Sequence, residues 1–194
     1  MSRRGYTLAE MMVTLAVISV MAAMSVPAFT RMTSGSRQGA AVREVFMLVQ
    51  EARTEARGRN QAVRFDVTSA VVNGSAVQEV RWGRLPCGDA WGRTCPSAAC
   101  ASSTTCGGSC ACESRSEAVR VPAGVTMTNV AGLCFLGSTA EPHGARCNAA
   151  DPTVTMLRFD LKDQPAPWLV VLDAVSGVAR LVDCARVPKD GSCP

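Results

Sequence analysis

The chain has 194 residues, of which 47% are hydrophobic and 19% are charged, and its mean hydropathy is slightly positive. This composition excludes an intrinsically disordered protein and allows one packed domain with an extension. The formal net charge of +4 is too small to indicate a nucleic-acid partner by itself.

The first predicted element is an uncharged apolar segment from Met11 to Phe29. As a helix it is about 28 Å long, close to the hydrocarbon thickness of a bilayer. Arg3 and Arg4 precede the segment, and this basic start predicts a cytoplasmic N-terminus and an exported C-terminal part. The sequence therefore predicts a single-pass inner-membrane protein whose remainder lies in the periplasm.

Glu10 lies at the cytoplasmic edge of this apolar segment. An unpaired carboxylate is costly to bury there, so its presence favours a retained helix with a cationic partner. The alternatives are a cleaved secretory signal peptide, which the small residues Ala22, Ala23 and Ala28 would suit, and a plain membrane anchor.

The string RGYTLAEMM at residues 4–12, followed by the apolar segment, resembles the class III signal of type IV pilins and pseudopilins. The resemblance implies that residues 1–5 are a leader peptide and that residues 6–30 form a transmembrane and assembly helix. It implies that a prepilin peptidase cuts between Gly5 and Tyr6 and methylates the new amine of Tyr6. In such proteins the carboxylate at the position of Glu10 pairs with the N-terminal amine of a neighbouring subunit, and opposite charges attract strongly in a low dielectric.

The outer half of the same long helix is predicted over residues 31–60. Its apolar residues recur every three or four positions and predict a stripe that packs on a sheet: Val42, Val45, Phe46, Val49, Ala52 and Ala56. Pro27 predicts a kink before this half, and Gly58 and Asn60 predict its end.

Residues 61–194 are predicted to form a β-sheet head. Its strands are predicted over residues 62–68, 77–85, 118–121, 125–130, 153–161, 168–172 and 178–182. Gly177 lies between the last two and indicates a hairpin. The predicted fold class is therefore α+β, with one long helix packed on an antiparallel sheet, as the resemblance to type IV pilins implies.

A narrower resemblance concerns residues 52–67, with the sequence ARTEARGRNQAVRFDV. This segment is similar to the junction between the helix and the first strand in the GspH/FimT family of minor pilins and pseudopilins. The closing hairpin from Trp168 to Val182 also suits that family. The segment from Cys87 to Cys112 matches no feature of the family.

Ten cysteines all lie in the second part of the chain, at Cys87, Cys95, Cys100, Cys106, Cys110, Cys112, Cys134, Cys147, Cys184 and Cys193. Their even number and density predict disulfides formed in an oxidising compartment. A metal site is the alternative, but no C-x2-C pair repeats and the single histidine, His143, lies in a segment predicted to be a mobile loop. We therefore predict no metal and no cofactor.

Six of the cysteines fall in the small-residue insert at residues 87–112. Such a segment has too few large apolar residues to fold by core burial, which predicts a surface loop held by cross-links. An adhesive or partner-binding loop is the alternative. Six cysteines allow 15 pairings, so the sequence leaves the connectivity open.

Cys184 and Cys193 bracket a short tail that carries Arg186 and Lys189, and their closeness indicates a small terminal disulfide loop. In some proteins that resemble the FimT branch, a basic C-terminal region binds DNA, so Arg186 and Lys189 are the candidate DNA-binding residues. Asp183 and Asp190 lie in the same stretch and offset this charge, which favours a structural loop.

Other basic and aromatic residues are interpreted as structural. Arg53, Arg57, Arg59 and Arg64 are predicted to form a solvated face near the helix end, because cations favour helix C-termini. Trp82, Trp91 and Trp168 are predicted to be core or loop anchors rather than base-stacking platforms.

The sequence contains no recognisable catalytic set or phosphate-binding loop, and we predict that the protein is not an enzyme. The predicted function is that of a structural minor pilin or pseudopilin of a type IV pilus or a type II secretion system. Its expected partners are other pilins, a prepilin peptidase and the inner membrane. The alternatives are a DNA-binding minor pilin for natural transformation and a membrane-tethered periplasmic binding protein that does not polymerise.

Overall fold

The computed structural model describes residues 8–84, 114–144, 147, 151–162 and 164–194, and only the backbone of residues 24–32. The predicted cleavage site and the insert at residues 87–112 lie outside these residues. The chain divides into two compact units, Met1–Ser36 and Arg37–Pro194. The second unit contains every strand of the described residues.

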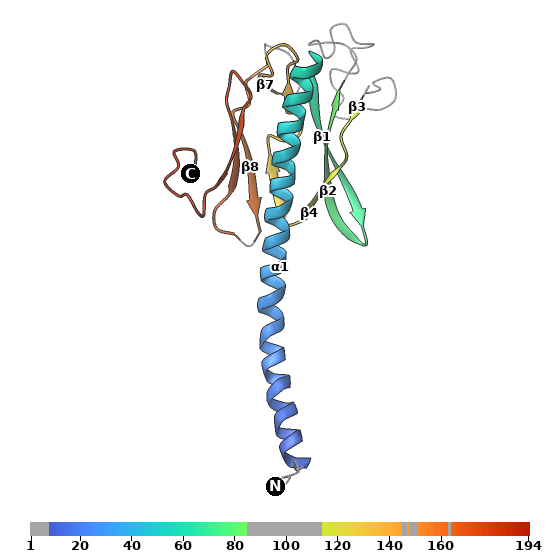
Figure 1. The fold of residues 1–194 in the computed structure, drawn as a ribbon, viewed down its shortest axis with the longest axis vertical. Helices are drawn as coiled ribbons and strands as arrows, with labels where there is room; N and C mark the ends of the chain where they lie inside the picture. The colour runs from blue at the N-terminus through green and yellow to red at the C-terminus, as the bar shows by residue number, and fades with distance from the viewer. Residues whose placement is uncertain (1–7, 85–113, 145–146, 148–150, 163) are drawn as a thin grey trace, which may run out of the picture. The chain divides into compact units, whose positions relative to one another are not determined.

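The only helix of the described residues, α1, runs from Leu8 to Arg59 (Figure 1). Pro27 does not end it, because its backbone remains helical on both sides of the proline. In the second unit α1 buries nearly the whole predicted stripe: Val42, Val45, Val49, Ala52 and Ala56 are fully buried, and Leu48 joins them while Phe46 is partly buried.

The end of α1 is set by Asn60, as the sequence predicted. Asn60 has a φ of 52°, in the left-handed region that asparagine tolerates better than most residues. The N–H of Gln61 donates to the carbonyl of Ala56 at 3.2 Å, which is the six-to-one bond of a Schellman motif. The chain thus turns sharply from the helix into the first strand.

The predicted α+β class is confirmed, but the strands form two antiparallel sheets rather than one. The six-stranded sheet has the order β3-β2-β1-β6-β7, with β4 also paired to β2. Its strands are β1 (Val63–Val72), β2 (Ser75–Arg84), β3 (Ser114–Arg115), β4 (Val119–Pro122), β6 (Cys134–Phe135) and β7 (Pro142–His143).

The four-stranded sheet has the order β10-β9-β8-β5. Its strands are β5 (Val125–Thr128), β8 (Met156–Leu161), β9 (Trp168–Leu172) and β10 (Ala179–Asp183). The chain changes sheets between β4 and β5, just after Pro122, whose missing N–H cannot continue a ladder. The sequence did not indicate this change of sheet, because apolar and polar residues alternate in the same way in β4 and in β5.

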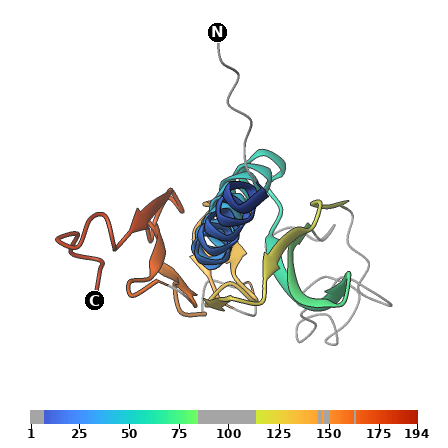
Figure 2. The same cartoon turned by 90° about the horizontal axis from the view of Figure 1, so that it is seen from below.

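Both sheets share one hydrophobic core with the outer half of α1. Phe65 and Phe135 come from the six-stranded sheet and Phe159 and Val170 from the four-stranded one, and all are fully buried in the cluster that contains the α1 stripe. Figure 2 shows the part of α1 that belongs to the second unit between the two groups of strands. This is the type IV pilin-like arrangement that the sequence predicted.

The long β1–β2 hairpin closes with Asn73 and Gly74, whose φ angles are 50° and 77°. Positive φ at both central residues defines the type I′ turn, for which Asn-Gly is the preferred sequence. The turn was not among the predicted features, and both strands extend up to it, with Val72 paired to Ser75.

Candidate functional site

Glu10 lies in the first turn of α1, where its side chain is exposed. A carboxylate is favoured at this end of a helix, because the unpaired N–H groups carry partial positive charge. The predicted processing residues Gly5 and Tyr6 lie outside the described residues. Their predicted relation to Glu10 stays a prediction.

Apolar side chains surround α1 on every side between Leu8 and Met21. Each of the large ones is more than half exposed: Leu8, Met11, Met12, Val13, Leu15, Val17, Ile18, Val20 and Met21. A helix that is apolar all round belongs in a core, a helix bundle or a lipid phase, and not in water. In water, this segment would leave a continuous apolar surface exposed.

The two hydroxyl groups in this segment bond to the helix itself. Thr14 Oγ1 donates to the carbonyl of Met11 at 2.9 Å, and Ser19 Oγ donates to the carbonyl of Leu15 at 2.8 Å. Hydroxyls that find a partner within their own helix can be placed in apolar surroundings at little cost. Neither residue interrupts the apolar character of the segment.

Hydropathy identifies no helix among the described residues that is both long and apolar enough to cross a membrane. The predicted span over residues 11–29 is thus not confirmed.

Arg84 fixes the root of the cysteine-rich insert to the end of α1. Its guanidinium is largely buried and lies 3.3 Å from Oε1 of Glu55 in α1. Arg84 is also the last residue of β2 and pairs with Ser114 of β3, so the chain leaves the sheet at residue 84 and returns beside it. Cys87, Cys95, Cys100, Cys106, Cys110 and Cys112 lie outside the described residues.

The structure joins Cys184 to Cys193 and so closes the C-terminal loop that their spacing indicated. Cys184 is buried with Leu169 and Val182 on the outer face of the four-stranded sheet, and Cys193 packs against them. The loop thus covers apolar side chains that face away from the main core.

Arg180 of β10 holds the far end of this loop. Its Nη1 donates to Oδ2 of Asp190 at 2.6 Å, and its Nη2 donates to Oδ1 of Asp190 and to Oγ of Ser192. The Arg180 guanidinium, together with hydrogen bonds from Ser192, holds the pKa of Asp190 well below its usual range. The loop is therefore fixed by a disulfide and by an ion pair.

The candidate DNA-binding residues Arg186 and Lys189 are both exposed on this loop. Arg186 Nε lies 3.3 Å from Oδ2 of Asp183, which offsets its charge. Trp82 and Trp168 are buried and offer no face on which bases stack, and Trp91 lies outside the described residues. DNA binding stays a prediction that this geometry does not favour.

The predicted solvated basic face is wrong for Arg64. This residue is only 2% exposed, whereas Arg57 and Arg59 are exposed and Arg53 donates to the carbonyl of Ser176 at 2.7 Å. Arg64 alternates with Val63 and Phe65 in β1 and points away from the main core. Burial lowers its pKa, an effect that the charges of Asp66 and Asp151 oppose.

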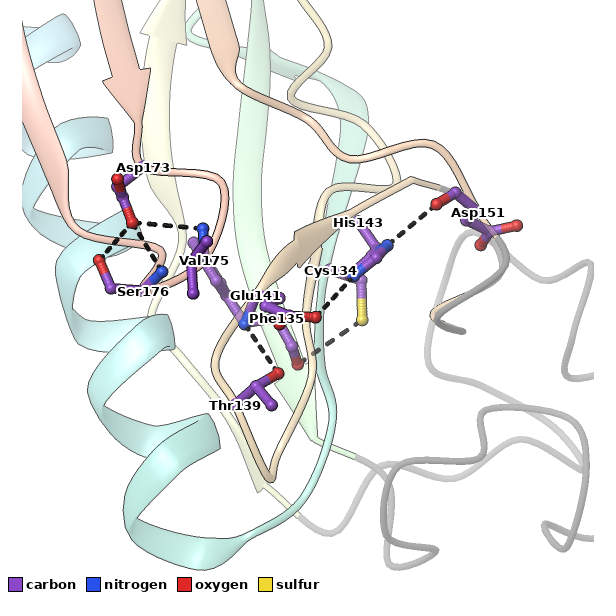
Figure 3. Close-up of polar contacts among 9 residues, drawn as sticks. All are labelled: Cys134, Phe135, Thr139, Glu141, His143, Asp151, Asp173, Val175 and Ser176. Carbon is purple, nitrogen blue, oxygen red and sulfur yellow. Dashed lines mark hydrogen bonds and ion pairs between the residues drawn. The ribbon is translucent and has the colours of Figure 1, made fainter.

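His143 is also buried, at 5% exposure, and lies in β7 rather than in the mobile loop that we predicted. Its Nδ1 lies 3.0 Å from the carbonyl oxygen of Asp151, and its Nε2 lies 3.3 Å from Oε2 of Glu141 (Figure 3). Because a carbonyl oxygen only accepts, Nδ1 is the donor in the first contact. His143 thus ties β7 to the chain that leads into β8.

A second disulfide reinforces the same region. Cys134 of β6 is joined to Cys147. Cys134 pairs with Arg64 in β1 and with His143 in β7, so these three side chains share one face of the sheet. Periodicity could not predict this face, because β6 and β7 have only two residues each.

Residues 1–26 match the family model described as the prokaryotic N-terminal methylation motif. No curated protein and no solved structure matches the chain.

The motif supports a type IV pilin-like protein, a class of structural subunits rather than enzymes, whose precursors are anchored in membranes. The fold agrees with this class, since a long N-terminal helix packs on antiparallel sheets.

Proposed function

We propose that the protein is a minor pilin or pseudopilin, which a prepilin peptidase cuts between Gly5 and Tyr6 and which then joins a fibre through α1. The observation that carries the proposal is the segment from Leu8 to Met21, which presents apolar side chains all round a helix within the residues that match the methylation motif. Packing of such helices against each other in a fibre would remove these side chains from water.

Glu10 is the charged group within this segment that we propose to guide docking. Once the leader is removed, Tyr6 supplies a positive chain end. The Glu10 carboxylate of a neighbouring subunit would attract this amine strongly in apolar surroundings. The proposed site in the cell is the inner membrane before assembly and a pilus or pseudopilus afterwards. The GspH/FimT type is the finer assignment that residues 52–67 favour.

Processing is tested by co-expressing the chain with a prepilin peptidase and measuring the intact mass. The expected product lacks Met1–Gly5 and carries one additional methyl group on Tyr6. A mature chain that begins at another residue would contradict the proposal. It would support a cleaved secretory signal or a plain anchor instead.

Assembly is tested with Glu10→Gln, with Glu10→Asp as the matched control. Loss of the charge is expected to lower incorporation into sheared fibres at least about tenfold, because a desolvated amine is left without a counter-charge. The aspartate variant keeps the charge and should retain most incorporation. Equal incorporation of Glu10→Gln and the wild-type chain would remove the proposed role of Glu10 in assembly. Absence of the wild-type chain itself from sheared fibres would remove the proposed function and favour a tethered protein that does not polymerise.

A further inference from the structure

A groove of about 730 Å³ runs along the second unit between α1 and the chain that leads into β4. Met47, Leu48 and Val119 give it an apolar lining, and Glu44, Glu51 and Glu117 line it as well. Met47 is 64% exposed there, although it lies next to the buried stripe of α1. Methionine is used often at binding surfaces, because its flexible, unbranched side chain adapts to the shape of a partner.

The acidic charge of this groove is not neutralised by ion pairs within the described part of the chain, where Glu44, Glu51 and Glu117 have no basic partner. Arg43 also lines the groove, but its guanidinium stacks over the ring of Trp168 at 5.4 Å. Three carboxylates against one arginine leave the groove negative. A partner segment that fits it is apolar at its centre and carries positive charge.

The wall of the groove is held in place before any partner binds. Ser116, directly before Glu117, donates its N–H to the carbonyl of Trp82 at 3.0 Å and accepts the N–H of Trp82 on its Oγ at 3.0 Å. On the other side α1 is anchored by its buried stripe. A preformed groove loses little conformational entropy on binding.

The C-terminal loop of the same chain has the complementary character. Val187 is half exposed and stands between the exposed cations Arg186 and Lys189. The Cys184–Cys193 disulfide, the Arg180–Asp190 pair and several backbone bonds, such as Val187 N–H to Asp183 O at 3.0 Å, fix its shape. Lys189 has no ion pair within the described residues, so its charge is available.

The groove and the loop lie on opposite sides of α1 within the second unit. Figures 1 and 2 both show β10 and the C-terminus on one side of the helix and β2 and β4 on the other. The Cys184–Cys193 disulfide and the Arg180–Asp190 pair hold the loop on its own side of the helix. Two different surfaces on opposite sides form a heterologous contact, which adds subunits in an open series.

We propose that the groove of Glu44, Met47, Glu51 and Glu117 receives the Cys184–Cys193 loop of a second copy of this chain, with Val187 on Met47 and Lys189 among the carboxylates. This inference rests on the proposed function, because both require that copies of the chain assemble with one another. The contact is small and is expected to be weak alone, but packing of the helices raises the effective concentration of the two surfaces.

The test places the photo-crosslinker p-benzoylphenylalanine at Met47 in the purified full chain in detergent micelles. Isotopically labelled and unlabelled protein are mixed, irradiated and digested, so that mass spectrometry identifies crosslinks between copies. The expected crosslink joins position 47 to residues 185–193 of the other copy. The matched control carries the crosslinker at Val71, which is 74% exposed on β1, outside the lining of the groove, and should not capture that segment.

Charge reversal separates specific docking from random collision. Lys189→Glu alone and Glu51→Lys alone should each lower the crosslink at least about fivefold, and the combined variant should restore it because the charges are exchanged. Failure of the combined variant to restore the crosslink would overturn the proposal. So would capture of another segment at position 47, which would assign the groove to a different occupant.

The Glu10→Gln variant distinguishes this inference from the proposed function. In micelles the contact between heads does not involve Glu10, so the crosslink should form at the same position in that variant. If Glu10→Gln leaves fibre incorporation unchanged, the proposed assembly mechanism fails while the crosslink still decides whether the groove binds the loop.

Discussion

Gly177 lies in the turn between β9 and β10 and packs closely against the β6–β7 hairpin. Its φ is +64°, and a β-carbon built there would collide with the carbonyl oxygen of Ala140 and crowd Phe135. The turn between β9 and β10 therefore approaches the β6–β7 hairpin more closely than any side chain allows. Only glycine meets both the backbone angle and the contact.

Gly177→Ala is expected to lower the free energy of unfolding by about 2 to 4 kcal/mol, because it adds backbone strain and a steric clash. Urea titration monitored by tryptophan fluorescence measures the change. Gly191→Ala is the control, since an added β-carbon there meets nothing within 4 Å. Equal stability of the two variants would contradict the packing described for Gly177.

Asp190 predicts a pH dependence of stability. Its pKa is lower in the folded chain than the ordinary value of 3.8, chiefly because Arg180 donates to its carboxylate. The folded state thus binds fewer protons than the unfolded state near this pH, so the stabilisation is present above about pH 4 and is lost as the pH falls below it.

Asp190→Asn is therefore expected to lower the Tm modestly at neutral pH, and its difference from the wild-type chain should shrink as the pH falls from about 4 to about 2. Thermal melts at a series of pH values measure this. A difference that stays constant across the series would show that the loss of the side chain, and not its charge, is responsible.

Among the secondary structure elements, the longer ones were predicted well. The stripe of α1 repeats over four turns, β9 matches its predicted bounds, and Asn60 terminates the helix as its residue type indicated. Periodicity identifies an element only when the element spans several repeats. For that reason β3, β6 and β7, with two residues each, were missed.

The burial of Arg64 and His143 follows from the same short elements. Each residue is polar and was assigned to the surface, but β6 places Cys134 between them, and Cys134 is bonded to Cys147. Which cysteines pair, and therefore which polar residues become covered, depends on contacts between distant segments. The sequence alone does not contain that information in a readable form.

The terminal disulfide loop offers a test at the scale of an element. Cys184→Ala with Cys193→Ala is expected to lower the free energy of unfolding by about 2 to 3 kcal/mol, because a loop of this length loses that much chain entropy on closure. Urea titration of the double variant measures the loss. An unchanged stability would mean that the Arg180–Asp190 pair and the apolar contacts of Leu169 and Val182 hold the loop alone.

For the head as a whole, Arg84 and Ser114 form the last strand pair before the chain leaves the sheet for the cysteine-rich insert. Replacement of residues 85–113 by Asn-Gly should leave the protein folded, with a Tm within about 5 °C of the wild-type value, because β2 and β3 then form a direct hairpin. Circular dichroism on heating measures this. Replacement of residues 69–72 by the same dipeptide is a fitting control, since it removes part of the β1 ladder and should cost more stability.

The adjacency of residues 84 and 114 has a practical consequence for anyone who modifies this protein. The two ends of a polypeptide inserted between them would lie only as far apart as two neighbouring strands. The length of the insert therefore need not disturb the pairing of β2 with β3. Epitopes, small affinity tags or a whole foreign domain with neighbouring termini are therefore best grafted at this junction. If the subunit polymerises as proposed, such a graft would be displayed once for every copy in the fibre.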